Sequence, residues 1–407
     1  MTLDVAKIRA HFPALAHGVV FFDGPGGSQV PDVVAAAVSA ALTAGLANRG
    51  SVTAGERAAD DIVGAARQAM ADLLGADPRG IVFGRSMTQL TYDFARTLAK
   101  TWRPGDEVVV TRLDHDANVR PWIAAADGVG ATVRWVDFDP ATGELSTDDV
   151  RAALSDRTRL VAVTGASNLI GTRPDLAAIA DLVHARGALF FVDGVHLAAH
   201  ASIDLDEIGA DLFACSPYKF MGPHCGVLAG RPEVLESLRP DKLLPSSSRI
   251  PERFELGTLP YELLAGCAAA VDFLAGLSTT TGDRRARIAS AMAAIAEHED
   301  RLRAGIEDGL ARLPGVIVHS RAAARTPTIL ITFDTREAAD AYRFLAGLGI
   351  NAPAGSFYAL EPARRLGLGD TGGLRIGVAP YNDTDDVDRL LNGLTEFLSN
   401  GTARVSG

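Results

Sequence analysis

The sequence predicts an α/β protein with a mainly parallel, doubly wound sheet and a smaller α/β domain at its C-terminal end. Short runs rich in β-branched residues alternate with amphipathic, alanine-rich segments, and a second, shorter set of both patterns follows. The length of 407 residues also exceeds the roughly 250–300 residues that one hydrophobic core supports. We therefore expect an N-terminal segment over 1–30 that packs with the small domain, a large domain over 31–280 and a small domain over 281–407.

The hydrophobic period assigns the elements of the large domain. Three helices flank the middle region and are expected at Pro31–Gly45, Glu56–Leu74 and Tyr261–Leu274. Six strands are expected at Gly80–Phe83, Glu107–Thr111, Thr132–Val136, Leu160–Val163, Ala188–Val192 and Asp211–Ala214. The helices between them are expected at Ser86–Lys100, Val119–Ala126, Thr147–Leu154 and Leu176–Arg186.

The last third of the chain repeats the two patterns on a smaller scale. A long helical pattern, Arg284–Leu313, leads out of the large domain. Strands are then expected at Val316–His319, Thr328–Phe333 and Leu374–Val378, and helices at Arg336–Leu345 and Asp385–Leu398. These elements are enough for a small domain with a core of its own.

Composition excludes several classes of protein. The net charge is -11 and the basic residues are scattered, which argues against nucleic acid as a partner. No uncharged apolar stretch approaches the roughly 20 residues of a membrane span, and Met1–Phe12 lacks the apolar core of a signal peptide. The three cysteines include no CxxC pair, so we expect neither a disulfide framework nor a metal site. We expect a soluble protein of the cytoplasm.

Ligands of doubly wound sheets bind beyond the carboxyl ends of the strands, so the residues after each expected strand are the site candidates. The first strand leads into Ser86, Met87 and Thr88 at the start of a helix, where free amides and the helix dipole favour a phosphate. The alternative is that Ser86 is a simple helix cap.

His115 and Asn168 follow two further strands. A flat imidazole at this edge can stack on an aromatic ligand, and an amide can hydrogen-bond a ligand oxygen. Both also have ordinary explanations, because His115 lies between two acids in a loop and Asn168 lies in a segment rich in turn residues.

Asp193 and Lys219 follow the last two strands. An acid at the end of an apolar strand is costly to bury unpaired, and a protonated pyridine nitrogen would be a suitable partner. A lysine in an apolar segment bounded by Gly and Pro can lose its proton through desolvation and form an imine. The alternatives are a helix cap for Asp193 and a surface position for Lys219.

The order of these candidates resembles that of fold-type I enzymes that use pyridoxal 5′-phosphate (PLP). In particular, the chain resembles the class V aminotransferase family, which includes cysteine desulfurases and selenocysteine lyases. The resemblance covers about Phe21 to Leu398. Its motifs are Asp193-Gly194-Val195-His196, Ser216-Pro217-Tyr218-Lys219 and Phe254-Glu255-Leu256-Gly257-Thr258, with a desulfurase-like opening at Phe22-Asp23-Gly24-Pro25-Gly26-Gly27. It implies a seven-stranded, mainly parallel sheet.

The resemblance implies a role for each cofactor residue. Lys219 would form a Schiff base with PLP and move the substrate's α-proton. Asp193 would pair with the pyridine nitrogen, His115 would stack on the ring, and Asn168 and His196 would contact the ring hydroxyl. The expected phosphate-binding residues are Ser86, Met87, Thr88, Ser216 and Tyr218. Thr258 would reach the phosphate of a neighbouring protomer, which implies a homodimer with shared active sites.

The resemblance also implies a substrate site for an amino acid. Arg375 would bind the substrate carboxylate through two parallel charge-assisted hydrogen bonds; the alternative is a surface arginine on an edge strand. The segments Gly26–Gln29, Asn48–Ser51 and Gly355–Tyr358 would face the substrate side chain. The individual candidates there are Gly27, Ser28, Asn48, Arg49, Ser356 and Tyr358.

Three departures from the desulfurase pattern bear on the reaction. His196 replaces a Gln and Tyr218 replaces a His, so a histidine proton relay next to the lysine is lost. The segment Asn351–Tyr358, which corresponds to the loop of the persulfide cysteine, contains no cysteine. We therefore expect a C–S lyase that performs β-elimination on an L-cysteine derivative without an enzyme persulfide.

Other reactions stay open on the sequence alone. An aminotransferase, a decarboxylating deaminase or an amino-acid epimerase would use the same lysine and aspartate. A non-catalytic binding protein that has kept the fold is the alternative from another class. A nicotinamide-dependent dehydrogenase is disfavoured, because no GxGxxG lies between an expected strand and helix.

Overall fold

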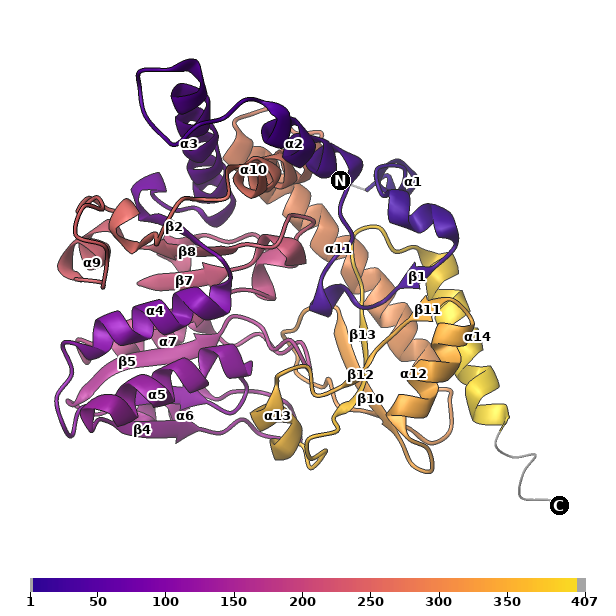
Figure 1. Cartoon of the computed structure of the whole chain (residues 1–407). Coiled ribbons are helices and arrows are strands. Elements are labelled where there is room, and N and C mark those ends of the chain that lie inside the picture. The colour runs from indigo at the N-terminus through magenta and orange to yellow at the C-terminus, as the bar shows by residue number, and fades with distance from the viewer. Residues whose placement is uncertain (1–2, 401–407) are drawn as a thin grey trace.

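The computed structural model describes residues 3–400, and its centre is a seven-stranded sheet (Figure 1). The strand order is β2-β8-β7-β6-β5-β3-β4. The strands are β2 (Ile81–Gly84), β3 (Glu107–Thr111), β4 (Thr132–Val136), β5 (Thr158–Thr164), β6 (Leu189–Asp193), β7 (Leu212–Cys215) and β8 (Gly226–Gly230). Only β8 runs antiparallel to its neighbours, which confirms the mainly parallel sheet expected from the sequence.

Strand β8 was not predicted from the sequence. Its residues are Gly-Val-Leu-Ala-Gly, a short run with one β-branched residue and glycine at both ends, so its local β-propensity is low. Glycine is required at its start, because a Cβ on Gly226 would lie 2.3 Å from the carbonyl carbon of Ser86. The close approach of these two backbones places β8 beside the start of the helix that follows β2.

Helices cover both faces of the sheet (Figure 1). Val108 and Val110 of β3 pack into a core with helices α4 (Met87–Ala99) and α5 (Arg120–Val129). Val109, between them, points to the opposite core. That core is shared by α3 (Ala54–Leu74), α6 (Thr147–Ala153), α7 (Leu176–His184), α10 (Tyr261–Gly276) and the N-terminal half of α11 (Arg284–Leu310). This arrangement is the doubly wound architecture.

The C-terminal part is built on a four-stranded antiparallel sheet of order β12-β13-β10-β9. Its strands are β9 (Val316–Val318), β10 (Thr328–Phe333), β12 (Ala354–Gly355) and β13 (Gly373–Gly377). Its apolar core also includes residues of α11, α12 (Ala338–Gly347) and α14 (Thr384–Ser399). Strand β1 (Val20–Phe21) pairs with β11 (Ile350–Asn351), so the N-terminal segment lies beside this part of the chain.

The remaining helices are short, apart from α2 (Asp32–Thr43), and are α1 (Val5–Arg9), α8 (Leu205–Ile208), α9 (Pro232–Ser237) and α13 (Leu360–Arg365). Most boundaries lie within about three residues of the sequence-based expectation. The domain limits at 30 and 280 stay a prediction, and the expected outer ranges extend into residues 1–2 and 401–407, which lie outside the described part of the chain. Among residues 3–400, no helix is long and apolar enough to cross a membrane.

Candidate active site

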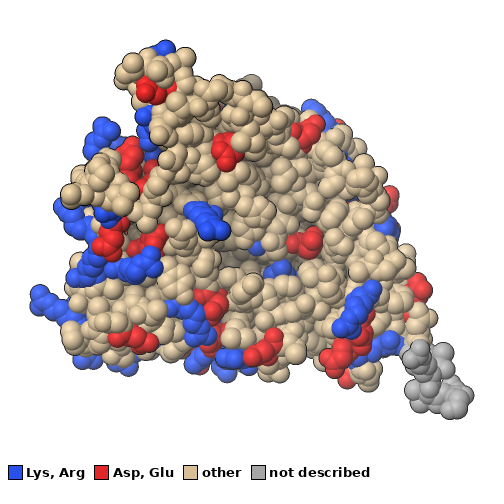
Figure 2. Space-filling model, in the orientation of Figure 1, with Lys and Arg blue, Asp and Glu red and all other residues tan. Residues whose placement is uncertain are grey.

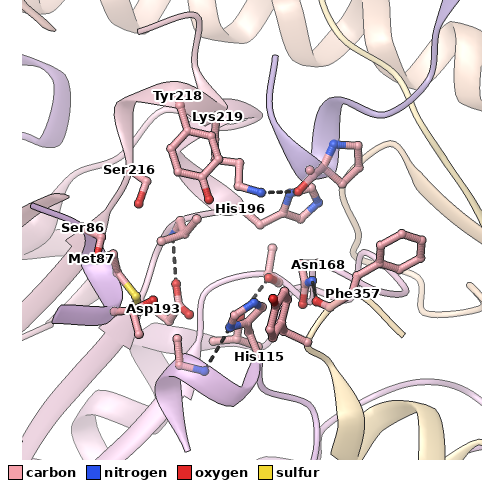
Figure 3. A pocket seen from close by; sticks show the side chains of 18 of the residues that line it. Ser86, Met87, His115, Asn168, Asp193, His196, Ser216, Tyr218, Lys219 and Phe357 are labelled. Carbon is pink, nitrogen blue, oxygen red and sulfur yellow. Dashed lines mark hydrogen bonds between the residues drawn. The ribbon is translucent and has the colours of Figure 1, made fainter. Parts of the chain in front are cut away.

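A cavity of about 310 Å³ lies at the carboxyl ends of the parallel strands, between the large sheet and the C-terminal part (Figure 3). It brings together residues that follow five different strands. The sequence-predicted residues that line it are Ser86, Met87, Thr88, His115, Asn168, Asp193, His196, Ser216, Tyr218, Lys219, Tyr358 and Arg375. The face of the molecule shown in Figure 2 carries interspersed acidic and basic side chains around a hollowed, mostly uncharged centre.

Lys219 ends a 3-10 turn, Pro217–Lys219, directly after β7. Its Nζ donates a hydrogen bond to the carbonyl of Pro25 and lies 5.0 Å from the centre of the Tyr218 ring. Burial and the positive charge of Arg375 lower the pKa of Lys219 to about 7, against the opposing effect of Asp193. Because this lowered pKa leaves part of the amine unprotonated near neutral pH, the amine can act as a nucleophile or a base.

Asp193 is the last residue of β6 and is buried. Its Oδ1 accepts a hydrogen bond of 3.0 Å from the amide of Val195. Burial raises the pKa of Asp193 to about 6, although the amide and Lys219 lower it. A buried carboxyl group in this position favours a cationic partner, which would keep it ionised.

His115 faces Lys219 across the cavity (Figure 3). Its Nδ1 accepts a 3.0 Å hydrogen bond from the amide of Ala117, so a neutral ring carries its proton on Nε2. Burial lowers the pKa of His115 to about 4, with further lowering by the charges of Lys219 and Arg375. The side chain is therefore a neutral, flat imidazole at neutral pH.

His196 and Asn168 each present an unsatisfied polar atom. The Nε2 of His196 lies 3.0 Å from the hydroxyl of Thr326 and 2.8 Å from that of Thr328, and burial lowers the pKa of the ring. The Nδ2 of Asn168 donates to the carbonyl of Phe357 at 3.0 Å. Within residues 3–400, the buried Nδ1 of His196 and Oδ1 of Asn168 have no partner. Both residues line the cavity, so these atoms suit a polar ligand.

The opposite end of the cavity is formed by Ser86, Met87 and Ser216 (Figure 3). Ser86 caps α4, because its Oγ accepts a 3.1 Å hydrogen bond from the amide of Gln89. The amides of Met87 and Thr88 in the first helical turn have no intrahelical acceptor. Ser86 can therefore cap α4 while the amides of Met87 and Thr88 remain available to bind an anion. This end of the cavity suits a phosphate.

Arg375, on β13, is buried beside Asn168 and Phe357. Its Nη1 donates to the carbonyl of Asn168 at 2.9 Å, and its guanidinium stacks 3.6 Å from the centre of the Phe357 ring. Its Nε is buried and has no hydrogen-bond partner among the described residues, so it can take a further acceptor. A Cβ on Gly26 would lie 3.3 Å from Nη2, so any larger residue at this position would crowd the guanidinium. Burial lowers the pKa of Arg375 to about 9, and the group stays cationic at neutral pH.

The structure places the other predicted substrate residues outside the cavity lining. Gly27 packs against the Tyr218 ring, and Ser28 bonds the carbonyl of Tyr218 and the amide of Met221, so both hold the lysine segment. Ser356 lines an adjacent groove.

Three further predicted residues also lie elsewhere in this protomer. Arg49 pairs with Asp60 at 2.7 Å, and Thr258 lies in a separate groove with Leu256. Neither Asn48, Arg49 nor Thr258 is among the residues that line the cavity of their own chain.

Several residues that help to form the site were not predicted individually from the sequence. The carbonyl of Pro25 and the ring of Phe357 lie inside segments that the sequence singled out, but neither was named individually. Thr326 and Thr328, which hold His196, carry no local pattern, because they lie about 130 residues from it along the chain.

The donor set fits PLP. The amine of Lys219, with its lowered pKa, matches the aldehyde of the cofactor, and the buried carboxyl group of Asp193 matches the ring nitrogen. The neutral imidazole of His115 matches the ring face, and the unsatisfied atoms of Asn168 and His196 match the ring hydroxyl. The N-terminus of α4 matches the phosphate. Fold and site together define a PLP-dependent enzyme of fold type I.

Comparison with known proteins specifies the family. Residues 20–390 match the family described as aminotransferase class-V, and the chain belongs to that family. It is 35% identical to an uncharacterized protein of Mycobacterium tuberculosis, over 98% of this chain and 100% of that one. It is 32% identical to a probable cysteine desulfurase of Pseudomonas aeruginosa, over 96% and 97% of the two chains. The crystal structure of the cysteine desulfurase CsdA from Escherichia coli superposes with a TM-score of 0.86 at 29% identity, covering 98% and 99% of the chains.

Proposed function

We propose that the protein is a PLP-dependent C–S lyase that performs β-elimination on an L-cysteine derivative without forming an enzyme-bound persulfide. The observation that carries the proposal is the position of its cysteines. All three are buried, and none lines the cavity. The similarity to proteins named cysteine desulfurases supports a sulfur-containing amino acid as the substrate.

A persulfide mechanism needs a reactive thiolate that reaches the substrate sulfur. Burial raises the pKa of Cys215, and the Sγ of Cys225 lies 3.2 Å from that of Cys267 inside the core. The segment 351–358, where the desulfurase loop is expected, carries Phe357 and Tyr358 but no cysteine. A protonated thiol buried behind the site is a poor nucleophile, which favours direct elimination.

The proposed reaction balances without an oxidant or a reductant. A cysteine S-conjugate and water give pyruvate, ammonia and a thiol; the Cβ–S bond breaks and its electron pair leaves on sulfur. When bound, PLP supplies an electron sink for the carbanion formed at Cα. The unprotonated Nζ of Lys219 takes the Cα proton. The carboxylate of Asp193 stabilises a positive charge at the far edge of the site.

Arg375 binds and orients the substrate in this proposal. Its Nε lacks a partner among the described residues, and we propose that the guanidinium forms two parallel hydrogen bonds with the substrate carboxylate. The neutral imidazole of His115 covers one side of the site. The unsatisfied atoms of Asn168 and His196 would bind the ring hydroxyl of PLP.

We also propose a homodimer in which Thr258 completes the phosphate site of the other protomer. The groove that contains Thr258 is lined by Phe254, Leu259 and the half-exposed Leu256. Arg49 is fixed by Asp60 outside its own cavity, which suits a role at the partner's site. Sedimentation of wild type and of Leu256→Glu tests this: the wild type should sediment as a dimer and the variant should dissociate, whereas a monomeric wild type contradicts the proposal.

The reaction is tested with purified holoenzyme and a panel of L-cysteine conjugates. We expect stoichiometric pyruvate and thiol, with no persulfide on the protein. A panel that yields neither product contradicts the proposal, and accumulation of pyridoxamine phosphate with an amino donor would indicate transamination instead.

The role of Lys219 is tested by borohydride reduction followed by peptide mapping. We expect the reduced cofactor on the peptide that contains Lys219, and no fixed cofactor in Lys219→Ala. Lys100→Ala, on the surface, is the matched control and should be labelled like wild type. A label on another lysine contradicts the assignment.

A further inference from the structure

The segment between β12 and α13 carries two successive aromatic residues in an unusual backbone conformation. Phe357 has a φ of 53° and Tyr358 a φ of 58°, in the left-handed region that bulky residues avoid. Such strain persists only where surrounding contacts hold it. Here the carbonyl of Phe357 accepts from Asn168 at 3.0 Å, and that of Tyr358 accepts from the amide of Asp116 at 2.8 Å.

The conformation places the two rings at the substrate end of the cavity. Phe357 stacks on the guanidinium of Arg375, and the Tyr358 ring lies 5.7 Å from that of His115. Tyr358 is nevertheless 78% exposed, so its ring is not part of a core. Strain that is stored to hold an exposed aromatic ring beside a reactive site indicates a binding role.

The same two residues also line a second hollow. A groove of about 360 Å³ is formed by Asp116, Ser356, Phe357, Tyr358 and Leu360, and it shares Phe357 and Tyr358 with the main cavity. The groove therefore adjoins the main cavity at these two rings.

The chemistry of the groove favours an uncharged occupant. Its one acid, Asp116, is paired with Arg120 at 2.8 Å, and Arg120 also binds Glu361 at 2.6 Å. The only acid among the residues that line the groove is thus paired within the protein, while Phe357, Tyr358 and Leu360 offer apolar surface. Aromatic side chains bind flat apolar groups by stacking and by burial of apolar area.

We propose that the Phe357–Tyr358 turn selects amino acids with a flat, uncharged aromatic group beyond the γ position, so that the preferred substrates are S-aryl conjugates of L-cysteine. The sulfur in this statement rests on the proposed lyase function; the aromatic preference does not. Tyr358 is a specificity-determining residue, and its hydroxyl is not required.

The test separates binding from chemistry by means of carbon isosteres. L-homophenylalanine matches S-phenyl-L-cysteine, and L-norvaline matches S-methyl-L-cysteine, but neither isostere can release a thiol. Their dissociation constants are measured by calorimetry on the holoenzyme. We expect homophenylalanine to bind at least about tenfold more tightly than norvaline. Equal binding of the two overturns the proposal.

Two variants at position 358 assign the preference to the ring. Tyr358→Phe should keep it, and Tyr358→Asn should lose most of it, measured as the ratio of the dissociation constants of norvaline and homophenylalanine. Because Asn tolerates a positive φ better than Tyr, Tyr358→Asn should melt no lower than wild type. A lower melting temperature would indicate that the ring has a packing role, and a retained preference would show that another surface binds the aromatic group; either result overturns the proposal.

Release of thiophenol from S-phenyl-L-cysteine then distinguishes failure of the lyase function from failure of the aromatic preference. If homophenylalanine is preferred but no thiophenol or pyruvate forms, the lyase function fails and the aromatic preference stands. If thiols form from both conjugates with equal kcat/KM and the isosteres bind equally, the lyase function stands and the preference fails.

Discussion

At the scale of single residues, burial sets the properties of the titratable groups in the site. It lowers the pKa of Lys219 to about 7 and that of His115 to about 4, and it raises that of Asp193 to about 6. Near neutral pH, Lys219 can thereby act as a base, His115 is neutral, and the ionised form of Asp193 is disfavoured relative to an exposed aspartate. The charge of Arg375 reinforces the first two shifts, so Arg375 and the amine of Lys219 are electrostatically linked.

This link predicts a pH dependence for cofactor uptake. Condensation of PLP with the apoprotein needs the unprotonated amine, so its rate should rise with pH through a midpoint near the pKa of about 7. Arg375→Met removes a positive charge that disfavours the protonated amine, and it should move the midpoint upward. Stopped-flow absorbance between pH 5.5 and 9 measures both. A wild-type midpoint near 10, the usual value for lysine, would contradict the burial of the amine.

The proposed role of Arg375 in binding the substrate carboxylate predicts the behaviour of Arg375→Lys. An ammonium group cannot form two parallel hydrogen bonds, so about 1.5–3 kcal/mol of binding should be lost, and KM for amino acids should rise about 10- to 100-fold. Steady-state kinetics measures the change. The matched ligand without a carboxylate, the corresponding S-substituted cysteamine, should bind wild type and variant equally; an equal loss for both ligands would indicate a distorted site.

At the scale of elements, one buried ion pair connects α3, β2 and the segment that carries Thr258. Arg67 of α3 bonds both carboxylate oxygens of Glu255 at 2.8 and 2.7 Å, and it also bonds the carbonyl of Ile81. Glu255 accepts a further 3.0 Å hydrogen bond from the amide of Phe83. The glutamate of the Phe-Glu-Leu-Gly-Thr motif thus holds the start of the sheet, a structural role that the sequence did not reveal.

Removing one partner of this pair should destabilise the fold. We expect Arg67→Met to lower the free energy of unfolding by about 3–5 kcal/mol, because it leaves a buried carboxylate uncompensated. The double variant Arg67→Met/Glu255→Leu should recover part of the loss. Urea unfolding measures both, and Arg79→Met, which removes the exposed pair with Asp77, is the control with little effect. An equally small effect at Arg67 would contradict the burial of the pair.

At the scale of the whole molecule, the site exists only where the two sheets meet. Asp193, His115 and Lys219 come from the large sheet, and Arg375 and Phe357 come from the C-terminal part. The hydrogen bonds of His196 with Thr326 and Thr328 join the two parts directly behind the cavity. A ligand that fills the cavity therefore bridges them and stabilises the whole fold.

Cofactor removal should lower the melting temperature. At PLP concentrations of 100 times the Kd, binding contributes about 2.7 kcal/mol, which corresponds to about 3 °C for a chain of this length. Differential scanning calorimetry of holoprotein and apoprotein measures the shift, and added PLP should restore it. Pyridoxal, which lacks the phosphate, should restore less; equal restoration would contradict a phosphate site at the start of α4.

The sequence alone predicted much of this protein, because the information is local. Hydrophobic period located most strands and helices within a few residues, and the carboxyl ends of the strands identified Ser86, His115, Asn168, Asp193 and Lys219 as candidates. It missed β8, whose first glycine, Gly226, is explained by the approach of Ser86, and it could not connect His196 with threonines about 130 residues away.

Only the tertiary structure decided how the candidates act together. The burial of the unpartnered Arg375 Nε, the lowered pKa of Lys219 and the positive φ of Tyr358 all arise from contacts between distant segments. Residue type and spacing indicated a PLP-dependent enzyme, although several reactions stayed open on the sequence alone. The packing of one sheet against the other determined the desolvation, the charges and the strain that set the properties of the site, because each of these depends on neighbours that are not adjacent in the sequence.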